Sequence, residues 1–163
     1  MPDVAGLRPT PDRVRETLFN WLQPVINGAH CLDLYAGTGI LGLEAVSRGA
    51  SDAILVEQDL VLFAQIRRNI EILDAGASVR AEQAGALEWL RHNQHKFDLV
   101  FLDPPFAQGL LARSAQFLRE RECLLPHAMI YMESEPGLQP PDGFRVVKQG
   151  TAGKVKFMLV ELL

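Results

Sequence analysis

Cysteines, clustered histidines and long apolar runs are scarce in this sequence. Its two cysteines, Cys31 and Cys123, fit neither a disulfide framework nor a metal-ligand spacing, and its four histidines are scattered along the chain. We therefore assign no metal. No apolar run approaches the roughly 18 residues that a membrane span requires, and the first residues lack the basic-then-apolar pattern of a signal peptide. These absences predict a cytoplasmic protein with reduced cysteines and no membrane association.

An excess of positive charge is absent as well. The formal net charge of −4 argues against a simple nucleic-acid-binding domain, for which a basic surface is the usual signature. A local positive surface is still open, because basic residues gather near both ends of the chain, and scattered surface charge is the alternative. The two groups are Arg8, Arg13 and Arg15, and Lys148, Lys154 and Lys156.

Hydrophobic residues make up 48% of the 163 residues, which is enough for a substantial core. We predict a single domain over residues 1–163. Within it, Thr10 and Pro11 form a good helix opening, with a hydroxyl at the N-cap and proline at the first helical position. Apolar residues at helical spacing then predict a first helix over 11–22, so residues 1–22 would form an N-terminal cap segment and helix.

Short apolar runs alternate with helical patterns through most of the chain. This rhythm predicts an α/β protein with a doubly wound, mostly parallel sheet covered by helices on both faces. The predicted strands are 31–35, 53–57, a short run near Val79, 97–102 and 128–133, and the predicted helices are 40–48, 59–73, 84–92 and 110–120. Two last runs, 144–149 and 154–161, flank residues 150–153 and predict an antiparallel C-terminal hairpin.

The first predicted strand leads into a Gly-x-Gly-x-x-Gly motif at the start of a helix. Its glycines, Gly37, Gly39 and Gly42, permit a tight turn and a close approach of a nucleotide-like ligand to the backbone. Glu57 ends the second predicted strand 18 residues after Gly39, where a carboxylate can accept both hydroxyls of a ribose. The alternative for Gly42 is helix packing. The combination favours a ligand that contains a nucleoside.

Asp33 lies just before the glycines and helps to separate two such ligands. A carboxylate there would repel the pyrophosphate of a dinucleotide, but it would attract the ammonium group of the methionine moiety in S-adenosylmethionine. The alternative is a carboxylate that only accepts backbone N–H groups of the turn. The position of Asp33 therefore favours S-adenosylmethionine.

A second motif closes the predicted strand 97–102. It consists of Asp103, Pro104, Pro105 and Phe106. Prolines hold the residues before them extended, so the Asp103 carboxylate and the Pro104 carbonyl become a rigid pair of acceptors beside a ring. Such a pair suits a planar NH2 group, whose hydrogens the two oxygens accept while Phe106 stacks on its face. A plain strand-to-loop turn is the alternative.

The predicted topology brings the two motifs together. In a doubly wound sheet the first and fourth strands lie side by side, and ligands bind beyond their carboxyl ends. We therefore expect the glycine loop and the tetrapeptide 103–106 to face one cleft. A methyl donor held by the loop would then point at an amine held by the tetrapeptide.

These motifs resemble a known family. The tetrapeptide is similar to the Asp/Asn-Pro-Pro-Tyr/Phe hallmark of class I S-adenosylmethionine-dependent methyltransferases that act on amines. More narrowly, the chain resembles the RsmD family over nearly its whole length. That similarity is carried by Leu-Arg-Pro-Thr at 7–10, the block at 12–22, Asp-Leu-Tyr-Ala-Gly-Thr-Gly at 33–39 and Tyr-Met-Glu at 131–133. Members of the family methylate the exocyclic amine of a guanine in small-subunit (16S) ribosomal RNA.

The resemblance implies a Rossmann-like class I methyltransferase fold, S-adenosylmethionine as the cofactor and ribosomal RNA as the partner. It implies target contacts at Asp103, Pro104, Pro105 and Phe106, and donor contacts at Arg8, Thr10, Asp33, Tyr35, Gly37, Gly39 and Glu57. Because the isolated chain is acidic, we expect the RNA to be presented within a small-subunit ribonucleoprotein particle.

The chain departs from the family pattern at two places. Family members usually begin further upstream, with a Gly- and Arg-rich segment. They also usually place Asp or Asn where this chain has Gly85. The adenine amine of the donor would then depend on backbone groups of Gly85 and Ala86, or on Gln83.

Three other functions are open from the residues. An adenine amine in DNA or RNA, or a glutamine amide, presents the same planar NH2 group as guanine. A nicotinamide-dependent oxidoreductase would need only the glycine loop and Glu57, but it is disfavoured by Asp33 and leaves the tetrapeptide unexplained. A donor-binding or RNA-binding module without activity is the third.

Overall fold

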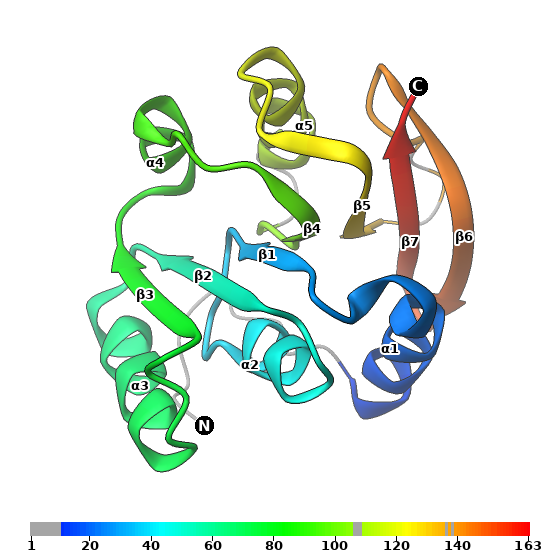
Figure 1. The fold of residues 1–163 in the computed structure, drawn as a ribbon. Helices are drawn as coiled ribbons and strands as arrows, with labels where there is room; N and C mark the ends of the chain where they lie inside the picture. Colours follow the sequence, from blue (N-terminus) through cyan, green and yellow to red (C-terminus); the bar gives the residue numbers. More distant parts are fainter. Residues whose placement is uncertain (1–10, 106–108, 136, 138) are drawn as a thin grey trace.

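The computed structural model describes residues 11–105, 109–135, 137 and 139–163. In this part of the chain, seven strands form one sheet in the order β3-β2-β1-β4-β5-β7-β6, with helices on both faces (Figure 1). The helices are α1 (Asp12–Ile26), α2 (Ile40–Ser47), α3 (Leu60–Ile72), α4 (Ala86–His92) and α5 (Leu110–Glu120). The strands are β1 (His30–Asp33), β2 (Asp52–Glu57), β3 (Val79–Gln83), β4 (Phe97–Leu102), β5 (Leu124–Ser134), β6 (Phe144–Ala152) and β7 (Val155–Leu162).

Two apolar layers, one on each face of the sheet, hold the helices in place. Helices α1, α2 and α3 pack on one face, and α4 and α5 pack on the other (Figure 1). Successive side chains of β4 alternate between the layers: Phe101 joins Phe19 of α1, while Val100 joins Leu118 of α5. Each such fully buried side chain stabilises the fold by about 1.5–3 kcal/mol. The predicted doubly wound α/β architecture is confirmed.

The central pair of parallel strands is β1 and β4, as the topology argument predicted. Asp33, the last residue of β1, lies in register with Phe101 near the end of β4. The Leu34 N–H donates to the Phe101 carbonyl at 3.1 Å, so the pairing continues to the edge of the sheet. The carboxyl ends of the two strands therefore meet side by side.

The N-terminal end of α1 differs slightly from the prediction. The helix begins at Asp12, and Pro11 is the N-cap, whose carbonyl accepts the Arg15 N–H at 3.0 Å. The predicted N-cap, Thr10, lies outside the described residues.

The C-terminal end of α1 contradicts the prediction of a helix over 11–22, because the helix continues through Pro24 to Ile26. Pro24 lacks the N–H that would bond the Asn20 carbonyl, but Asn20 is exposed and its carbonyl can bond solvent. Ile26 is only 4% exposed, so tertiary packing of the last turn outweighs the lost hydrogen bond.

Strand β5 begins earlier than the predicted start at 128. Leu124 already pairs with Phe97 of β4, and the register shifts before the next pair. Pro126 suggests a break at this point, and His127 adopts a positive φ of 65°. The strand runs through both residues with an irregularity instead of ending at them.

The predicted C-terminal hairpin is confirmed, with a shorter turn. Gly153 and Lys154 join β6 to β7, in place of the predicted turn at 150–153. Gly150 lies inside β6 opposite Phe157, and a Cβ at position 150 would lie 2.6 Å from the Phe157 ring. That ring stacks on Trp21 of α1. Gly150 therefore marks close packing and not a turn.

Both cysteines are buried and free. Burial, together with the nearby carboxylates of Asp52 and Asp98, raises the pKa of the Cys31 thiol to about 12. Burial also raises the pKa of Cys123. Both thiols therefore stay protonated at neutral pH and are poor nucleophiles.

Within the described part of the chain, no helix combines the length and the apolar character that a membrane span needs.

Candidate functional site

The glycine loop connects β1 to α2 at the carboxyl edge of the sheet. Gly37 and Gly39 adopt positive φ angles of 62° and 84°, which residues with a Cβ rarely tolerate. Gly39 is the N-cap of α2, and a Cβ there would lie 2.8 Å from Leu55 and 3.3 Å from Ile66. The loop thus folds tightly onto β2 and α3, and its backbone is free of side chains at these two turns.

Glu57 at the end of β2 holds this loop in shape. One carboxylate oxygen accepts the Gly37 N–H at 2.9 Å, and the other accepts the Asp59 N–H at 2.8 Å. Asp59 in turn caps α3 by accepting the Leu62 N–H at 3.0 Å. Each carboxylate oxygen has two lone pairs, so Glu57 can bind these backbone groups and still accept the hydroxyls of a ribose.

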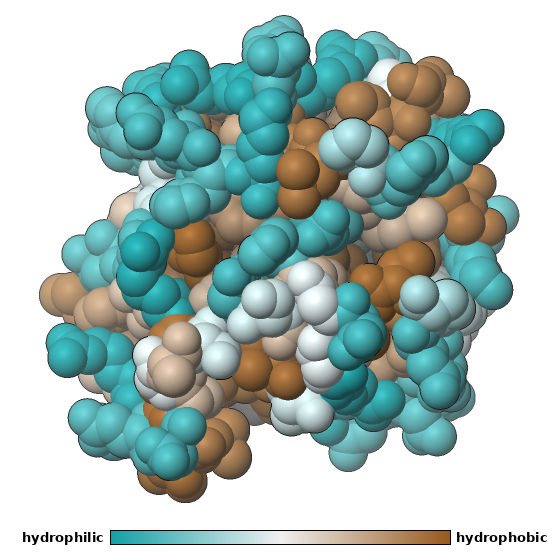
Figure 2. Space-filling model, viewed as in Figure 1, coloured by the Kyte–Doolittle hydropathy of each residue, from teal (hydrophilic) through white to brown (hydrophobic). Residues whose placement is uncertain are grey.

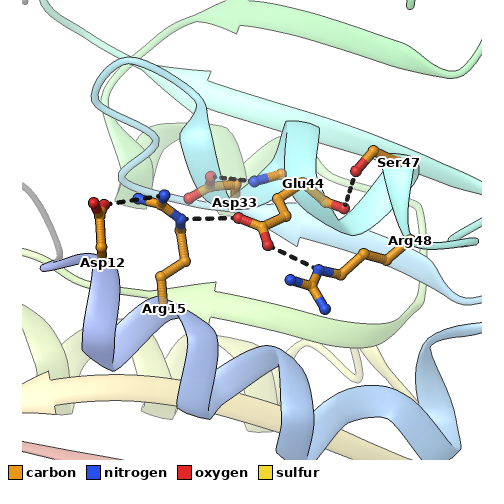
Figure 3. Close-up of polar contacts among 7 residues, drawn as sticks. Asp12, Arg15, Asp33, Glu44, Ser47 and Arg48 are labelled. Atoms are coloured by element: carbon orange, nitrogen blue, oxygen red, sulfur yellow. Dashed lines mark hydrogen bonds and ion pairs between the residues drawn. The ribbon is translucent and has the colours of Figure 1, made fainter.

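Asp33 is buried beneath the start of α2 and is 3% exposed. Its carboxylate accepts the Gly42 N–H at 3.1 Å (Figure 3). Burial raises the pKa of Asp33 to about 7, because it outweighs the lowering by the Gly42 N–H, and Glu57 adds to the rise. Asp33 therefore makes the backbone contact that was one of its two interpretations, and a cation arriving at this carboxyl would favour its ionised form.

The sequence analysis did not predict two side-chain contacts that support the loop. Asn69 of α3 donates its side-chain amide to the Thr38 carbonyl at 3.1 Å, which braces the loop between the two glycines. The Tyr35 hydroxyl lies 2.7 Å from the buried Ser114 hydroxyl of α5, and burial raises the pKa of Tyr35. A polar residue at a half-buried position of α3 was the available signal for Asn69, but only tertiary packing shows which carbonyl it meets.

The predicted adenine end of the site lies where β3 leads into α4. Gly85 is the N-cap of α4 with an extended backbone, φ −69° and ψ 143°. A Cβ at Gly85 would meet only the Gln58 side chain, at 3.5 Å, so a larger residue fits there. Gln83 instead donates its amide to the Gln58 carbonyl at 2.9 Å. Ala86, the other predicted contact, is the first residue of α4.

The second motif follows β4 at the same edge. Asp103 is partly exposed, Pro104 is buried and Pro105 is exposed, while Phe106 lies outside the described residues. Burial raises the pKa of the Tyr131 hydroxyl on β5, and the nearby carboxylates of Glu133 and Asp103 raise it further. The buried Tyr131 hydroxyl therefore lies close enough to both carboxylates to be affected by their charge.

Helix α1 is fixed against α2 by a chain of ion pairs (Figure 3). Arg15 bonds Glu44 at 2.9 Å and also contacts Asp12 at 3.1 Å. Glu44 in turn binds Arg48 at 2.8 Å. These contacts place the beginning of α1 beside the helix that follows the glycine loop. The predicted donor contacts Arg8 and Thr10 precede α1 and lie outside the described residues.

The carboxyl edge is acidic. Four strands end there with carboxylates within two residues of their last positions, which are Asp33, Glu57, Asp59, Asp103 and Glu133. Such an edge attracts a cationic ligand and repels a pyrophosphate. Among the described residues, no group of three or more His, Cys, Asp or Glu side chains is arranged to hold a metal ion.

Comparisons with known proteins identify relatives of this chain. The model of a family described as "Conserved hypothetical protein 95" matches residues 1–161. The chain is 44% identical to "Ribosomal RNA small subunit methyltransferase D" of Escherichia coli strain K12, over 99% of this chain and 82% of that protein. It is 42% identical to the protein of the same name from Haemophilus influenzae, over 96% of this chain and 83% of that one.

A solved structure is similar as well. The "Putative methyltransferase yhhF from Escherichia coli" superimposes with a TM-score of 0.88 at 43% sequence identity, covering 98% of this chain and 90% of the other. The class I methyltransferase fold predicted from the sequence is therefore confirmed.

Proposed function

The chain belongs to the RsmD family, and from that membership we propose that it transfers a methyl group from S-adenosylmethionine to the exocyclic amine of a guanine in small-subunit ribosomal RNA. The observation that carries the proposal is the pairing of β1 with β4. It sets the glycine loop and the Asp103–Pro104 corner at one edge, where one cleft can hold a donor and an amine.

S-adenosylmethionine supplies a methyl group bonded to a positively charged sulfur. The residues present fit this group, because the edge offers carboxylates for cations and a glycine backbone for close contact. Glu57 would hold the ribose, Asp33 the ammonium group, and the backbone of Gly85 and Ala86 the adenine. Asp33 has a pKa of about 7, so it can ionise when the ammonium group arrives.

The amine of guanine is a poor nucleophile, because its lone pair is delocalised into the ring. The Asp103 carboxylate and the Pro104 carbonyl would accept its two hydrogens, which favours a pyramidal nitrogen and directs the lone pair toward the methyl group. S-adenosylmethionine would supply the methyl group at this nitrogen, where an N–C bond would replace the S–C bond, and the amine would then lose one proton. Positioning and fixed dipoles account for the rate, and no covalent enzyme intermediate is needed.

The same arrangement disfavours two alternatives. A nicotinamide-dependent oxidoreductase must bind a pyrophosphate, which the acidic edge repels. An inactive binding module would not need the Asp103–Pro104 corner. The residues alone do not separate guanine from adenine or from a glutamine amide, so the choice of guanine in ribosomal RNA rests on the family.

Transfer of labelled methyl groups tests the proposal. The acceptors are small-subunit particles from cells that lack the modification, the ribosomal RNA extracted from them, and DNA. We expect incorporation into RNA, highest with the particles, and digestion to nucleosides should yield N2-methylguanosine. Label in adenosine, in protein or only in DNA would overturn the assignment.

A further inference from the structure

The edge that would receive the guanine is unfavourable for the rest of an RNA strand. Asp33, Glu57, Asp103 and Glu133 gather there, and RNA carries a negative charge on every phosphate. Coulomb repulsion would oppose binding unless cations near the same edge hold the phosphates.

The C-terminal hairpin brings positive charge to that edge. Residues 144–163 contain four Lys or Arg residues and one acid, in a chain with a net charge of −4. Since β7 runs antiparallel to β5, Lys156 pairs with Ser134, the last residue of β5. The hairpin turn therefore lies beside the carboxyl end of β5. Strand β7 is two positions from β4 in the sheet, about 10 Å from the strand that leads to Asp103.

A cavity of about 390 Å³ opens at this corner. Its described lining consists of Gly137, Gln149, Gly150, Thr151 and Lys156, and it contains no carboxylate. Thr151 and Lys156 are cross-strand partners, so their side chains project from the same face of the hairpin, and Gln149 projects from that face two residues earlier. An amide, a hydroxyl and an ammonium group can thus donate hydrogen bonds into one space.

The backbone adds further donors. Strand β6 is the last strand of the sheet and pairs only with β7 in the described part of the chain, so alternate N–H groups along it face outward. Backbone N–H groups, hydroxyls and lysines are the usual partners of nucleic-acid phosphates. Figure 2 shows polar residues over most of the visible face, with apolar residues scattered among them. That face therefore suits a charged strand of RNA better than an apolar protein partner.

We propose that the hairpin cavity binds the phosphate backbone of the RNA strand that carries the target guanine, with Gln149, Thr151 and Lys156 as contacts. This inference rests on the proposed function and adds to it a binding surface on β6 and β7. Lys156 also interacts within the chain. Its ammonium group has three donors, so a phosphate can share it.

The test compares Lys156→Gln with Lys148→Gln, in methylation of small-subunit particles at several salt concentrations. Both variants remove one positive charge from the hairpin, but Lys148 does not line the cavity. For Lys156→Gln we expect KM for the particles to rise about three- to tenfold and its salt dependence to weaken by about one unit of slope, with unchanged kcat. Lys148→Gln should change KM less than about twofold.

Thr151→Ala provides a second probe that leaves the charge intact, and it should also raise KM. Equal effects of the two lysine variants would overturn the proposal. They would show that the lysines contribute only general positive charge, or that they keep the edge strand from pairing with other chains. Unchanged KM in both Lys156→Gln and Thr151→Ala would overturn it too.

The experiments distinguish an error in the proposed cavity from an error in the proposed function. If the wild-type protein methylates no RNA, the proposed function is wrong. If the wild-type protein methylates RNA and the cavity variants have unchanged KM, only the proposal that the cavity binds RNA is wrong. Fluorescence anisotropy with a labelled single-stranded oligoribonucleotide of about eight nucleotides reports on the cavity without turnover. Weaker binding by Lys156→Gln than by Lys148→Gln would support the cavity, and equal binding would count against it.

Discussion

The Glu57 carboxylate accepts the Gly37 N–H at 2.9 Å. The residue proposed to bind the ribose therefore also fixes the loop that would surround the donor. The other oxygen accepts the Asp59 N–H at the start of α3. One side chain thus connects the second strand, the glycine loop and the third helix. Its loss should affect donor binding through both direct contact and loop geometry.

Replacement of Glu57 by alanine should weaken the binding of S-adenosylhomocysteine by roughly 1.5–3 kcal/mol, because charged hydrogen bonds to the ribose and the loop are lost. Isothermal titration calorimetry measures this loss. Glu71→Ala, at an exposed position of α3, is the control and should bind normally. Unchanged affinity in Glu57→Ala would remove Glu57 from the donor site.

Replacement of Asp103 by alanine should lower kcat about 100-fold or more while donor affinity stays nearly constant, because Asp103 is proposed to hold only the target amine. Single-turnover methylation and calorimetry measure the two effects separately. The matched control is Asp98→Ala, at the opposite end of the same strand, where Asp98 accepts the His30 N–H at 2.8 Å. Turnover of Asp103→Ala at the wild-type rate would refute the assignment.

Donor binding should strengthen as pH rises from 6 to 8. Asp33, whose pKa burial raises to about 7, is mostly protonated at pH 6 and mostly ionised at pH 8, and only the ionised form attracts the ammonium group of the donor. The expected gain in affinity for S-adenosylhomocysteine is about tenfold. Asp33→Asn should bind more weakly and lose this pH dependence, and a wild-type affinity that is flat across this range would contradict the role.

The same carboxyl should affect the free energy of unfolding. The folded pKa of about 7 exceeds the ordinary value of 3.8, so the folded chain binds a proton that the unfolded chain releases between these pH values. The contribution of Asp33 to stability is therefore fully present below pH 3.8 and is lost as pH rises through 7. Urea unfolding of Asp33→Asn should show a smaller decline over this range than the wild-type chain.

Two glycines with similar backbone angles should respond differently to alanine. Gly28 and Gly39 have φ of 77° and 84°, so either substitution costs about 1–2 kcal/mol of backbone strain. A Cβ at Gly28 meets nothing within 4 Å, whereas at Gly39 it lies 2.8 Å from Leu55. In urea unfolding, Gly39→Ala should therefore lose about 1–3 kcal/mol more free energy of unfolding than Gly28→Ala loses. Equal losses would show that the loop does not pack as tightly as described.

Replacement of Gly85 by aspartate should tighten donor binding several-fold. The extended backbone of Gly85 suits any residue, the new side chain has room, and its carboxylate could accept the adenine amine of the donor. It should also cap α4, with a gain of a few tenths of a kcal/mol. Gly76→Asp, which adds the same charge elsewhere on the surface, should leave affinity unchanged. Equal affinities in both variants would place the adenine away from Gly85.

Several features of the fold followed from local patterns. The alternation of apolar runs and helical periods determined the α/β class, because the two periods reflect which faces are buried. The glycine motif and the Asp-Pro-Pro-Phe tetrapeptide marked the two corners of the candidate site, since their backbone requirements are local. The family resemblance then linked those corners to a chemistry.

Other features depended on contacts between distant residues, and the local patterns gave the wrong answer for them. Gly150 has the signature of a turn, but it lies within a strand because the Phe157 ring fills the space of its side chain. Pro24 suggests a helix end, but the buried Ile26 keeps the last turn in place.

By itself, the sequence determined the order of the elements and the position of the glycine loop, because these depend on residues close together in the chain. The tertiary structure decided that Glu57 braces the glycine loop and that a basic hairpin stands beside an acidic edge. Those relationships come from the packing of segments far apart in the chain, and no local spacing encodes them.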